Sequence, residues 1–368
     1  MLYILYSWQN CIFNPSSLYK LGQNSKEGIN KARKQVADAI NAFSEEIYFT
    51  SGGSEADNLI IKGFAKANKK KGRHIITSKI EHMAVLKTCF ALEEEGFDIT
   101  YLDVDASGSI KVDDLRRAIR QDTILISIML ANNEIGTIQP IKEIGEIAQK
   151  NNIFFHTDAV QGIGNMKIDV KTLKVDALSL SAHKFYGPKG VGALFVKKGK
   201  MFEPIIRGGH QELNKRAGTE NVPGIVGLGK AIEMANSRVE IYNEKLRKLS
   251  QHYIKEVFEK IPNIRLNGHT TKRLPGNVNI SFDGVDGGTL LLLLASEGIC
   301  VSSGSACNSG SSTPSHVLTA IGLPSNLSKG AIRVTFGEDN TVRDVDFLVS
   351  KLQYFISKIR NDGELVIK

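Results

Sequence analysis

Lys184 is the residue whose type and position most favour covalent chemistry in this sequence. It lies shortly after the predicted strand at 176–181 and precedes Tyr186-Gly187-Pro188, a tight-turn sequence. A lysine between a buried strand and a tight turn is expected to be buried, and desolvation suits a lysine amine to form a Schiff base with an aldehyde. Taken alone, Lys184 would fit a solvated surface lysine better.

Polar side chains directly follow three predicted strands. Because ligands in open α/β sheets bind outside the carboxyl ends of the strands, these side chains are expected to converge on one crevice. Any one cluster could be an ordinary loop, but three together favour a site. The clusters are Asn132, Asn133 and Glu134 after 123–130, His156, Asp158 and Gln161 after 153–155, and His183 and Lys184 after 176–181.

A glycine-rich turn, Ser51-Gly52-Gly53-Ser54, separates a predicted strand from an apolar-periodic helix. Glycines in such a turn let the backbone approach an anion, and the free amides of the new helix favour a phosphate. Ser54 to Asp57 also fits a capping box, so a plain capped turn is the alternative. Because the turn lacks GxGxxG and a P-loop lysine, it does not favour a dinucleotide or a nucleoside triphosphate.

Lys184, Asp158 and the glycine-rich turn together indicate pyridoxal phosphate as the cofactor. An aspartate at a strand end can pair with a pyridinium nitrogen, keep it protonated and make the ring an electron sink. For Asp158 alone the alternative is a helix cap. The combination favours the cofactor.

The segment Ser302–Pro314 consists almost entirely of small polar residues and is predicted to be an exposed loop. Packing does not explain a cysteine there, so Cys307 is a candidate nucleophile. Cys300 and Cys89 are expected in the core. The four cysteines are too few and too irregularly spaced for a disulfide framework or a zinc site, so reduced thiols and no resident metal are expected.

The elements around these residues predict an α/β fold. Between about Glu46 and Val196, short apolar runs alternate with helical stretches, which is typical of a largely parallel sheet covered on both faces. The clearest predicted strands are Glu46–Thr50, His74–Ser78, Thr123–Leu130, Ile153–His156, Asp176–Ser181 and Val191–Val196.

The last third of the chain is predicted to form a smaller α+β domain. Strands at Asn277–Phe282 and Ala331–Phe336 alternate with a leucine-rich helix and a final helix. The expected domains are 1–240, a large α/β domain that binds the cofactor, and 241–368, which carries the Cys307 loop. A long amphipathic helix between them is predicted from an apolar stripe of Tyr242, Leu246, Leu249, Tyr253 and Val257.

Length and composition agree with two domains. The 368 residues are 42% hydrophobic and 23% charged, as in ordinary globular proteins. The longest apolar run, Leu290–Ala295, is far shorter than the about 20 residues of a membrane span. Because 1–13 lacks the features of a secretory signal, the cytoplasm is the expected location. The net charge of +8 is scattered, and its densest cluster, Lys66–Arg73, fits a helix end, so no nucleic-acid partner is expected.

The chain resembles the cysteine desulfurase family from about Asn14 to its C-terminus. The resemblance implies fold type I of the pyridoxal-phosphate transferases, with a mainly parallel seven-stranded sheet in the large domain. It also implies removal of sulfur from L-cysteine, which leaves L-alanine and a persulfide. The most specific motifs are Thr50-Ser51-Gly52-Gly53-Ser54-Glu55, Glu81-His82, Ala131-Asn132-Asn133-Glu134-Ile135-Gly136-Thr137, Ser181-Ala182-His183-Lys184 and Ser302 to Ser309.

The loop around Cys307 is similar to that of the long-loop branch, which serves iron–sulfur cluster assembly or tRNA thiolation. The resemblance implies that Cys307 carries the persulfide to a sulfur-acceptor protein and could touch an iron–sulfur cluster transiently. Lys184 would remove the α-proton of L-cysteine. Thr219 would reach the phosphate from a second subunit, so a homodimer is expected.

The remaining roles that the resemblance implies concern the cofactor and the substrate. Without it, His82 could equally be a satisfied helix histidine, and Arg333 the solvent-facing member of an alternating strand. The implied contacts are Gly53, Ser54, Ser181 and His183 with the phosphate, catalytic His82 stacked on the ring, Asn133 and Gln161 with the 3-oxygen, Asp158 with the ring nitrogen, Arg333 with the substrate carboxylate, and Asn133 also with the substrate.

The chain departs from the family pattern at its start. Relatives have a longer N-terminal segment with a strand and an Ala-Thr-Thr turn, whereas only 1–13 precede Asn14-Pro15-Ser16-Ser17 here. Gly53-Ser54 stands where relatives usually have Ala-Thr. Three hypotheses follow: a working cysteine desulfurase, a related pyridoxal-phosphate enzyme such as a selenocysteine lyase or an aminotransferase, and a weakly active scaffold that binds partners.

Overall fold

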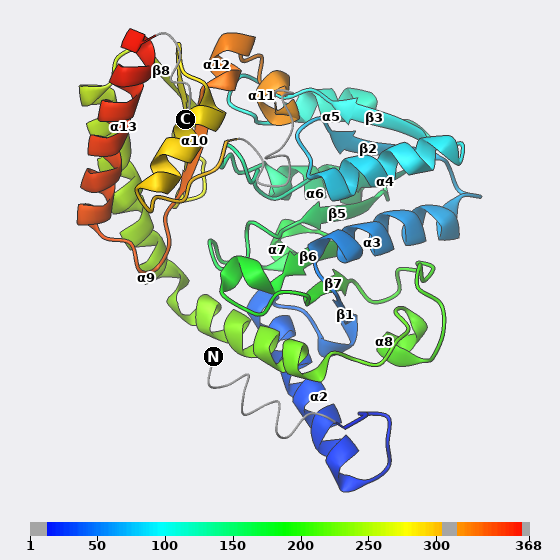
Figure 1. The fold of residues 1–368 in the computed structure, drawn as a ribbon. Coiled ribbons are helices and arrows are strands. Elements are labelled where there is room, and N and C mark those ends of the chain that lie inside the picture. Colours follow the sequence, from blue (N-terminus) through cyan, green and yellow to red (C-terminus); the bar gives the residue numbers. More distant parts are fainter. Residues whose placement is uncertain (1–12, 304–314, 363–368) are drawn as a thin grey trace. The chain divides into compact units, whose positions relative to one another are not determined.

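A seven-stranded sheet forms the centre of one of two compact units in the computed structural model, which describes residues 13–303 and 315–362 (Figure 1). Its strand order is β1-β7-β6-β5-β4-β2-β3. The strands from β3 through β6 are parallel, whereas β7 is antiparallel to both of its neighbours. The strands are Ile47–Thr50 (β1), His74–Ser78 (β2), Asp98–Leu102 (β3), Thr123–Ser127 (β4), Phe154–Asp158 (β5), Ala177–Ser181 (β6) and Gly192–Val196 (β7). The predicted mainly parallel α/β sheet is confirmed.

The predicted strands agree with the observed ones to within a few residues. β2 matches residue for residue, whereas β4 ends at Ser127 instead of Leu130. The chain beyond Ser127 stays beside β5, because the Leu130 N–H donates to the Asp158 carbonyl at 2.8 Å. β5 extends two residues past its predicted end and therefore includes Asp158.

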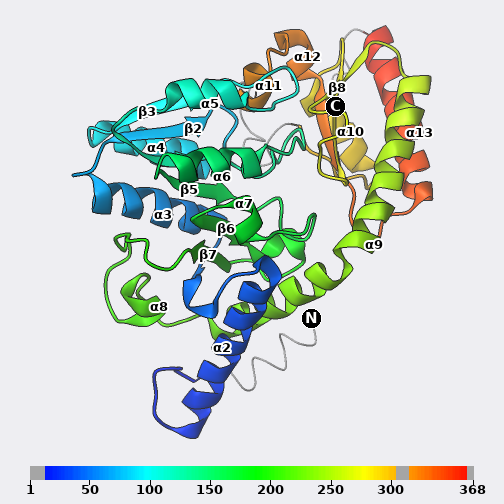
Figure 2. The same ribbon diagram turned by 180° about the vertical axis from the view of Figure 1, so that it is seen from behind.

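Helices cover both faces of the sheet, as the opposite views of Figures 1 and 2 show. α3 (Gly53–Asn68) and α4 (Met83–Glu94) pack on one face with a shared core that includes Leu59, Val85 and Cys89. α6 (Ile141–Lys150) packs on β5 from the other face. The unit also contains α2 (Lys20–Ile40), α5 (Val112–Ala118), α7 (Val170–Leu173), α8 (Gln211–Asn214), η1 (Ser44–Glu46) and η2 (Ala182–Phe185).

The other unit is built on a three-stranded antiparallel sheet of order β10-β9-β8. It comprises Asp103–Ser109, Ala131–Ile138 and the described residues of 240–368, whereas the sheet described above belongs to the remaining residues. Its elements are β8 (Ile264–Asn267), β9 (Asn277–Phe282), α10 (Gly287–Ser296), α11 (His316–Ala320), α12 (Ser325–Lys329), β10 (Ala331–Thr335) and α13 (Val342–Asp362).

The predicted amphipathic helix is confirmed as part of α9 (Val222–Lys260). Its stripe packs against β9, β10 and α13: Leu246, Leu249, Tyr253 and Val257 are buried, and Tyr242 is partly buried beside them. The stripe therefore forms one wall of the core of this second unit.

Cys300 is exposed, so its predicted place in the core is wrong. Its neighbours Ile299 and Val301 both pack against the core of the second unit, and the alternation of the extended chain directs Cys300 to the solvent. Cys89 is buried on α4, as predicted.

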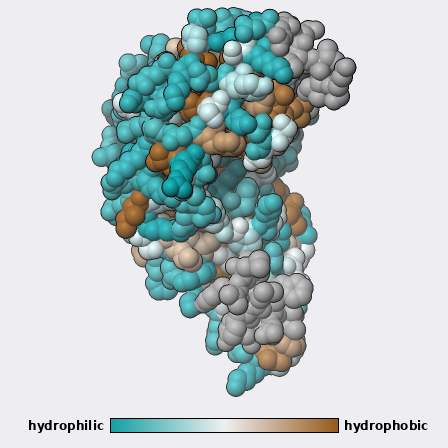
Figure 3. Space-filling model, turned by 60° about the vertical axis from the view of Figure 1, so that its left-hand side comes forward, coloured by the Kyte–Doolittle hydropathy of each residue, from teal (hydrophilic) through white to brown (hydrophobic). Residues whose placement is uncertain are grey.

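None of the helices in the described ranges has the length and apolar character that crossing a bilayer requires. On the face drawn in Figure 3, hydrophilic residues predominate and apolar residues form small separate groups.

Candidate active site

The first turn of α3 presents backbone amides that its N-cap does not satisfy. Gly52 is the N-cap and supplies no side-chain hydrogen bond. Glu55 instead accepts from the Ser51 N–H at 2.9 Å. The predicted Ser54–Asp57 capping box is wrong, because the helix already begins at Gly53 and buries Asp57. Such an uncapped start, at the positive end of a 16-residue helix, favours an anion.

Gly53 lets the start of α3 approach the neighbouring strand ends. A Cβ atom on Gly53 would lie 2.6 Å from Val160 Cγ2 and 3.7 Å from Ser181 Cβ. Ser181 ends β6, and its Oγ lies 3.0 Å from His183 Nδ1. The fold therefore brings three of the four predicted phosphate ligands together, and the fourth, Ser54, is exposed on the same helical turn.

Lys184 lies on η2, directly after β6. Its side chain is exposed, so its predicted burial is wrong. The 3-10 turn buries Ala182 and Phe185 and turns the two residues between them, His183 and Lys184, towards solvent. The predicted tight turn is present, since Tyr186 ends η2 in the left-handed region with a φ of 64°.

His183 carries a perturbed imidazole beside Lys184. Partial burial lowers its pKa, and the positive charges of Lys184 and Lys189 lower it further. The ring is therefore neutral near pH 7, although the residue as a whole is exposed. A neutral imidazole can donate one hydrogen bond to a phosphate oxygen.

Asp158 is a buried carboxyl at the carboxyl end of β5. Burial raises its pKa, while the Val160 N–H and the positive charges of His82 and Lys184 oppose that rise. Its Oδ1 accepts from the Val160 N–H at 2.9 Å, so Asp158 also stabilises the local turn. The structure thus places Asp158 within electrostatic range of His82 and Lys184.

His82 is the N-cap of α4. Its Nδ1 accepts from the Ala84 N–H at 3.1 Å, which assigns the proton of the neutral ring to Nε2. His82 therefore has a structural role as a helix cap, and this hydrogen bond fixes the orientation of its ring. Gln161, three residues after Asp158, is partly buried.

In the second unit, the guanidinium of Arg333 lies beside Asn133. Arg333 Nη1 donates to the Asn133 carbonyl at 3.1 Å, and Nη2 donates to Ser302 Oγ at 3.2 Å. Ser302 and Arg333 also exchange two backbone hydrogen bonds, of 3.1 and 2.7 Å. Arg333 is thus partly buried and is tied to Ser302, which lies two positions before residue 304.

For two predicted residues, the described structure gives no place at the site. Cys307 lies outside the described residues. Thr219 is exposed on the segment between α8 and α9. The roles predicted for both remain predictions.

Asp57 and Glu81 are buried polar residues beneath the site for which the sequence predicted no role in it, and His156, which was expected to border the crevice, is completely buried beneath it as well. Desolvation raises the pKa of Asp57 well above its usual range and that of Glu81 to about 8. Desolvation lowers the pKa of His156 to about 3. The signal in the sequence is a charged or polar residue at a position where a helix or strand is otherwise apolar.

The residues of the first unit fit pyridoxal phosphate. The uncapped amides of α3 and the Ser181 hydroxyl suit its phosphate. The Asp158 carboxyl is buried away from solvent, so it is suited to pair with a cationic ring nitrogen. The exposed amine of Lys184 is the group for its aldehyde.

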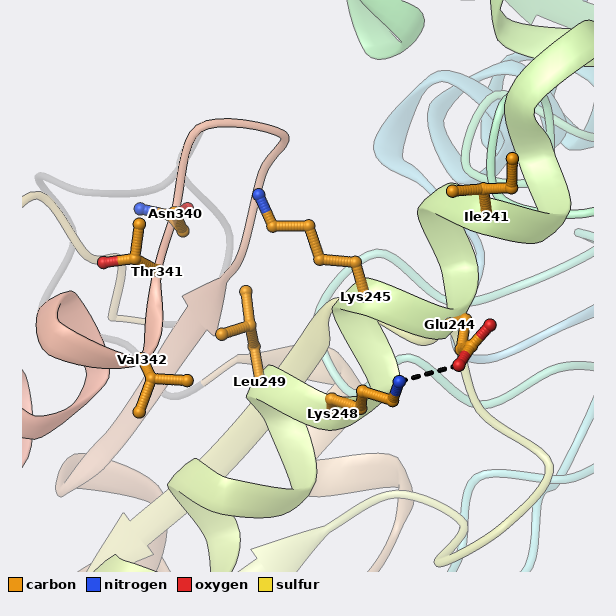
Figure 4. Close-up of a pocket in the computed structure, with 8 residues that line it drawn as sticks. All are labelled: Ile241, Glu244, Lys245, Lys248, Leu249, Asn340, Thr341 and Val342. Atoms are coloured by element: carbon orange, nitrogen blue, oxygen red, sulfur yellow. Dashed lines mark hydrogen bonds and ion pairs between the residues drawn. The ribbon is translucent and has the colours of Figure 1, made fainter.

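A separate groove of about 520 Å³ lies within the second unit, between α9 and the residues at the start of α13 (Figure 4). Ile241, Leu249 and Val342 line it together with Lys245 and the Glu244–Lys248 ion pair of 2.7 Å. No predicted site residue lines this groove.

Residues 6–348 match the aminotransferase class-V family. Cysteine desulfurase IscS of Methanosarcina thermophila is 58% identical over 355 residues, which cover 96% of this chain and 88% of that protein. Cysteine desulfurase IscS of Clostridium botulinum is 55% identical over 354 residues, which cover 96% of this chain and 89% of that protein. This chain belongs to the cysteine desulfurase family.

Solved structures agree with that family. A NifS-like protein superposes with a TM-score of 0.91 at 36% identity, covering 97% of this desulfurase and 95% of that chain. SspA in complex with cysteine superposes with a TM-score of 0.81 at 40% identity, covering 91% of this chain and 94% of that chain. The predicted family, fold type and dependence on pyridoxal phosphate are thereby confirmed.

Proposed function

We propose that this cysteine desulfurase transfers the sulfur of L-cysteine to Cys307 as a persulfide and leaves L-alanine. The observation that carries the proposal is the group formed by Asp158, His82 and Lys184 next to the uncapped start of α3. In a chain whose relatives are named cysteine desulfurases, this group is the one equipped to hold the cofactor.

Each residue of the group has a separate task. Pyridoxal phosphate, when bound, supplies an electron sink for the charge released at the substrate Cα. Asp158 would keep the ring nitrogen protonated, and His82 would lie against the ring with its orientation fixed by the cap to α4. Lys184 would take the α-proton of L-cysteine and later return it.

The sulfur transfer balances without an external oxidant or reductant. The Cβ–S bond of L-cysteine breaks, and an S–S bond forms to Cys307 Sγ. The proton of the Cys307 thiol ends on Cβ, which becomes the methyl group of L-alanine. A thiol reductant or an acceptor protein then removes the outer sulfur from the persulfide.

Arg333 and Asn133 would bind the substrate. The planar fork of Arg333 can pair with the substrate carboxylate in a bidentate manner. Its bonds to Ser302 and to the Asn133 carbonyl already fix the orientation of the fork. We therefore place the carboxylate site at the base of the segment that carries Cys307.

The test is product analysis with matched variants. Incubation with L-cysteine and a thiol reductant should release equal amounts of alanine and sulfide. Cys307→Ala should abolish both products, whereas Cys300→Ala, an exposed cysteine nearby, should keep them. Lys184→Ala should lose the absorption band of the bound cofactor, whereas Lys189→Ala should retain it.

Two results would count against the proposal. A cofactor-loaded protein that yields neither product would exclude a working desulfurase. Full turnover by Cys307→Ala would favour a related pyridoxal-phosphate enzyme, such as a selenocysteine lyase or an aminotransferase.

We further propose that the enzyme is a cytoplasmic homodimer that hands its sulfur to an acceptor protein of iron–sulfur cluster assembly or tRNA thiolation. The names of the relatives, cysteine desulfurase IscS, support such an acceptor. Thr219 supports the dimer, because it is exposed in the single chain and would complete the phosphate site of a second copy.

A further inference from the structure

α3 lies along β5, and successive contacts connect them from one end to the other. Near the far end, the Phe64 and Phe154 rings stack with their centroids 3.8 Å apart. In the middle, Asp57 Oδ1 lies 3.6 Å from His156 Nε2. At the near end, Gly53 approaches Val160 closely. The middle contact is polar, although the contacts on either side of it involve aromatic or aliphatic side chains.

His156 belongs to a row of polar side chains that crosses three adjacent strands. Its Nδ1 lies 2.9 Å from Ser127 Oγ on β4, and its Nε2 lies 3.0 Å from Ser179 Oγ on β6. All three side chains are completely buried. Such a row costs desolvation and persists only where its groups satisfy one another.

Asp57 joins this row from α3. Its carboxyl is 1% exposed and hydrogen-bonds to the Ser179 side chain, while Oδ1 is buried without a hydrogen-bond partner. Ser179 stands opposite Asp158 in the register of β5 and β6. Asp57 therefore connects the strand ends at the site to the helix whose first residue is Gly53, four positions earlier.

We propose that Asp57 is a positioning residue for the cofactor: through Ser179 and His156 it fixes the first turn of α3 over the ends of β5 and β6. The phosphate-binding amides of α3 and the carboxyl of Asp158 thereby keep a constant separation. This inference rests on the proposed function and extends it to a residue that touches neither cofactor nor substrate.

The charge states of the surrounding groups agree with this role. Asp57 faces Asp158 and Glu81, and burial together with those two carboxyls raises its pKa well above its usual range, which favours the neutral acid. His156 is neutral near pH 7, because burial lowers its pKa to about 3. A neutral Asp57 adds no second negative charge behind the carboxylate that the ring nitrogen requires.

The experiment compares three variants by their affinity for pyridoxal phosphate, measured by absorbance titration of the cofactor-free protein. Asp57→Ala removes the hydrogen-bonding group and should weaken binding about tenfold or more, as expected for buried partners left unsatisfied. Asp57→Asn keeps a neutral amide of the same shape and should stay within about threefold of the wild type. Thermal unfolding of each variant shows whether it is folded.

Asn68→Ala is the matched control, because Asn68 is a buried polar residue at the opposite end of the same helix. Its side chain donates to the Phe64 carbonyl at 3.0 Å and the Met201 carbonyl at 3.3 Å. This variant should weaken α3 but change cofactor affinity by less than about threefold. Equal losses of affinity in Asn68→Ala and Asp57→Ala, or wild-type affinity in Asp57→Ala, would overturn the proposal.

A spectroscopic titration tests separately whether Asp57 carries a charge. The pH midpoint of the absorption band of the bound cofactor should differ by less than about 0.5 unit between Asp57→Asn and the wild type. A larger shift would show that Asp57 carries a charge and would overturn this part of the inference. If the wild type itself binds no pyridoxal phosphate, the proposed function fails instead.

Discussion

Glu81 shows how a single buried residue couples this protein to pH. Its carboxyl accepts from Ser78 Oγ at 2.6 Å, and each of its oxygens lies 3.0 Å from the Met129 N–H. These hydrogen bonds lower the pKa of Glu81, but the effect of burial is larger and raises it to about 8. The folded protein therefore keeps the Glu81 proton over a range of pH in which the unfolded chain loses it.

The sign of the effect on stability follows from this difference. Between the ordinary value of 4.5 and about 8, the folded state binds more protons, so the free energy of unfolding falls as pH rises. In the wild type, Glu81 should lower the free energy of unfolding by on the order of a few kcal/mol as pH rises across that range, and Glu81→Gln should abolish this loss. Urea unfolding of the cofactor-free protein at pH 5, 6, 7 and 8 measures the two slopes.

Glu94→Gln is the control for this prediction, because Glu94 is an exposed carboxylate on α4. Its slope should equal that of the wild type. The prediction is wrong if Glu81→Gln and the wild type lose stability in parallel between pH 5 and 8.

At the residue scale, the sequence indicated which groups take part but not how they are oriented. Asp158 could be predicted, because the end of an apolar run marks the end of a buried strand. The exposure of Lys184 could not, because one 3-10 turn decides whether a residue after a strand points inward. The network around His156 was equally hidden, since burial of a polar residue depends on partners from other strands.

At the scale of elements, the segment at α8 departs most from regular geometry. Glu212, Leu213 and Asn214 have φ values of 47°, 56° and 64°. Each left-handed residue other than glycine costs roughly 1–2 kcal/mol. A buried ion pair compensates: Arg33 on α2 donates to both Glu212 oxygens at 2.7 Å, and Glu212 also accepts from the Phe49 N–H at 2.8 Å.

Arg33→Ala should therefore destabilise the protein by about 3–5 kcal/mol, because it leaves the Glu212 carboxylate buried without its cation. The glutamate side chain is only 3% exposed. Chemical denaturation of the cofactor-free protein measures the loss.

The neighbouring residue provides the control. Lys34 pairs with Asp38 at 2.7 Å, but both side chains are more than 60% exposed. Lys34→Ala should cost less than about 1 kcal/mol. Comparable losses in the two variants would show that the Arg33–Glu212 pair does not hold the left-handed segment.

The strands differ in how far their sequences could predict them. β4, β5, β6 and β7 are buried at every position. β4 and β7 are mostly apolar and are therefore easy to recognise, whereas β5 and β6 carry buried polar residues such as His156 and Ser179 among their apolar ones. β3 and β8 are edge strands with polar and partly exposed residues, and their patterns resemble those of loops. The capping box failed for another reason: the start of this helix depends on the backbone conformation at its N-cap, Gly52, and at its first residue, Gly53.

At the scale of the whole molecule, the second unit is assembled from separated segments. Asp103–Ser109 and Ala131–Ile138 belong to it, although the chain on both sides of each belongs to the first unit. Their hydrogen bonds explain this: the Thr137 hydroxyl donates to the Ser107 carbonyl at 2.6 Å, and the Asn277 side chain donates to the Asn133 carbonyl at 3.1 Å. Periodicity and composition carry no sign of such long-range pairing.

The proposed dimer makes a prediction about mixed assemblies. Lys184→Ala and Thr219→Ala subunits, unfolded and refolded together, should form heterodimers with one intact site if Thr219 serves the other subunit. That site combines the wild-type Lys184 of one chain with the wild-type Thr219 of the other. Desulfurase activity and cofactor occupancy at limiting pyridoxal phosphate measure the recovery.

The two homodimeric variants, treated in the same way, are the controls and should stay deficient. If Thr219 acts within its own chain, every site of the mixture carries one defect and no recovery occurs. Light scattering of the wild type establishes whether a dimer exists at all.

The close approach of Gly53 to Val160 has a consequence for the divergence of these enzymes. The 2.6 Å between a Cβ atom on residue 53 and the Val160 methyl leaves no room for alanine unless residue 160 becomes smaller or moves. The two positions should therefore covary: lineages with alanine at position 53 should carry a residue smaller than valine, or a differently shaped one, at position 160. Starting from glycine at position 53 and valine at position 160, a lineage could reach alanine at both positions most easily by changing position 160 first. A reconstructed phylogeny should show the substitutions in this order.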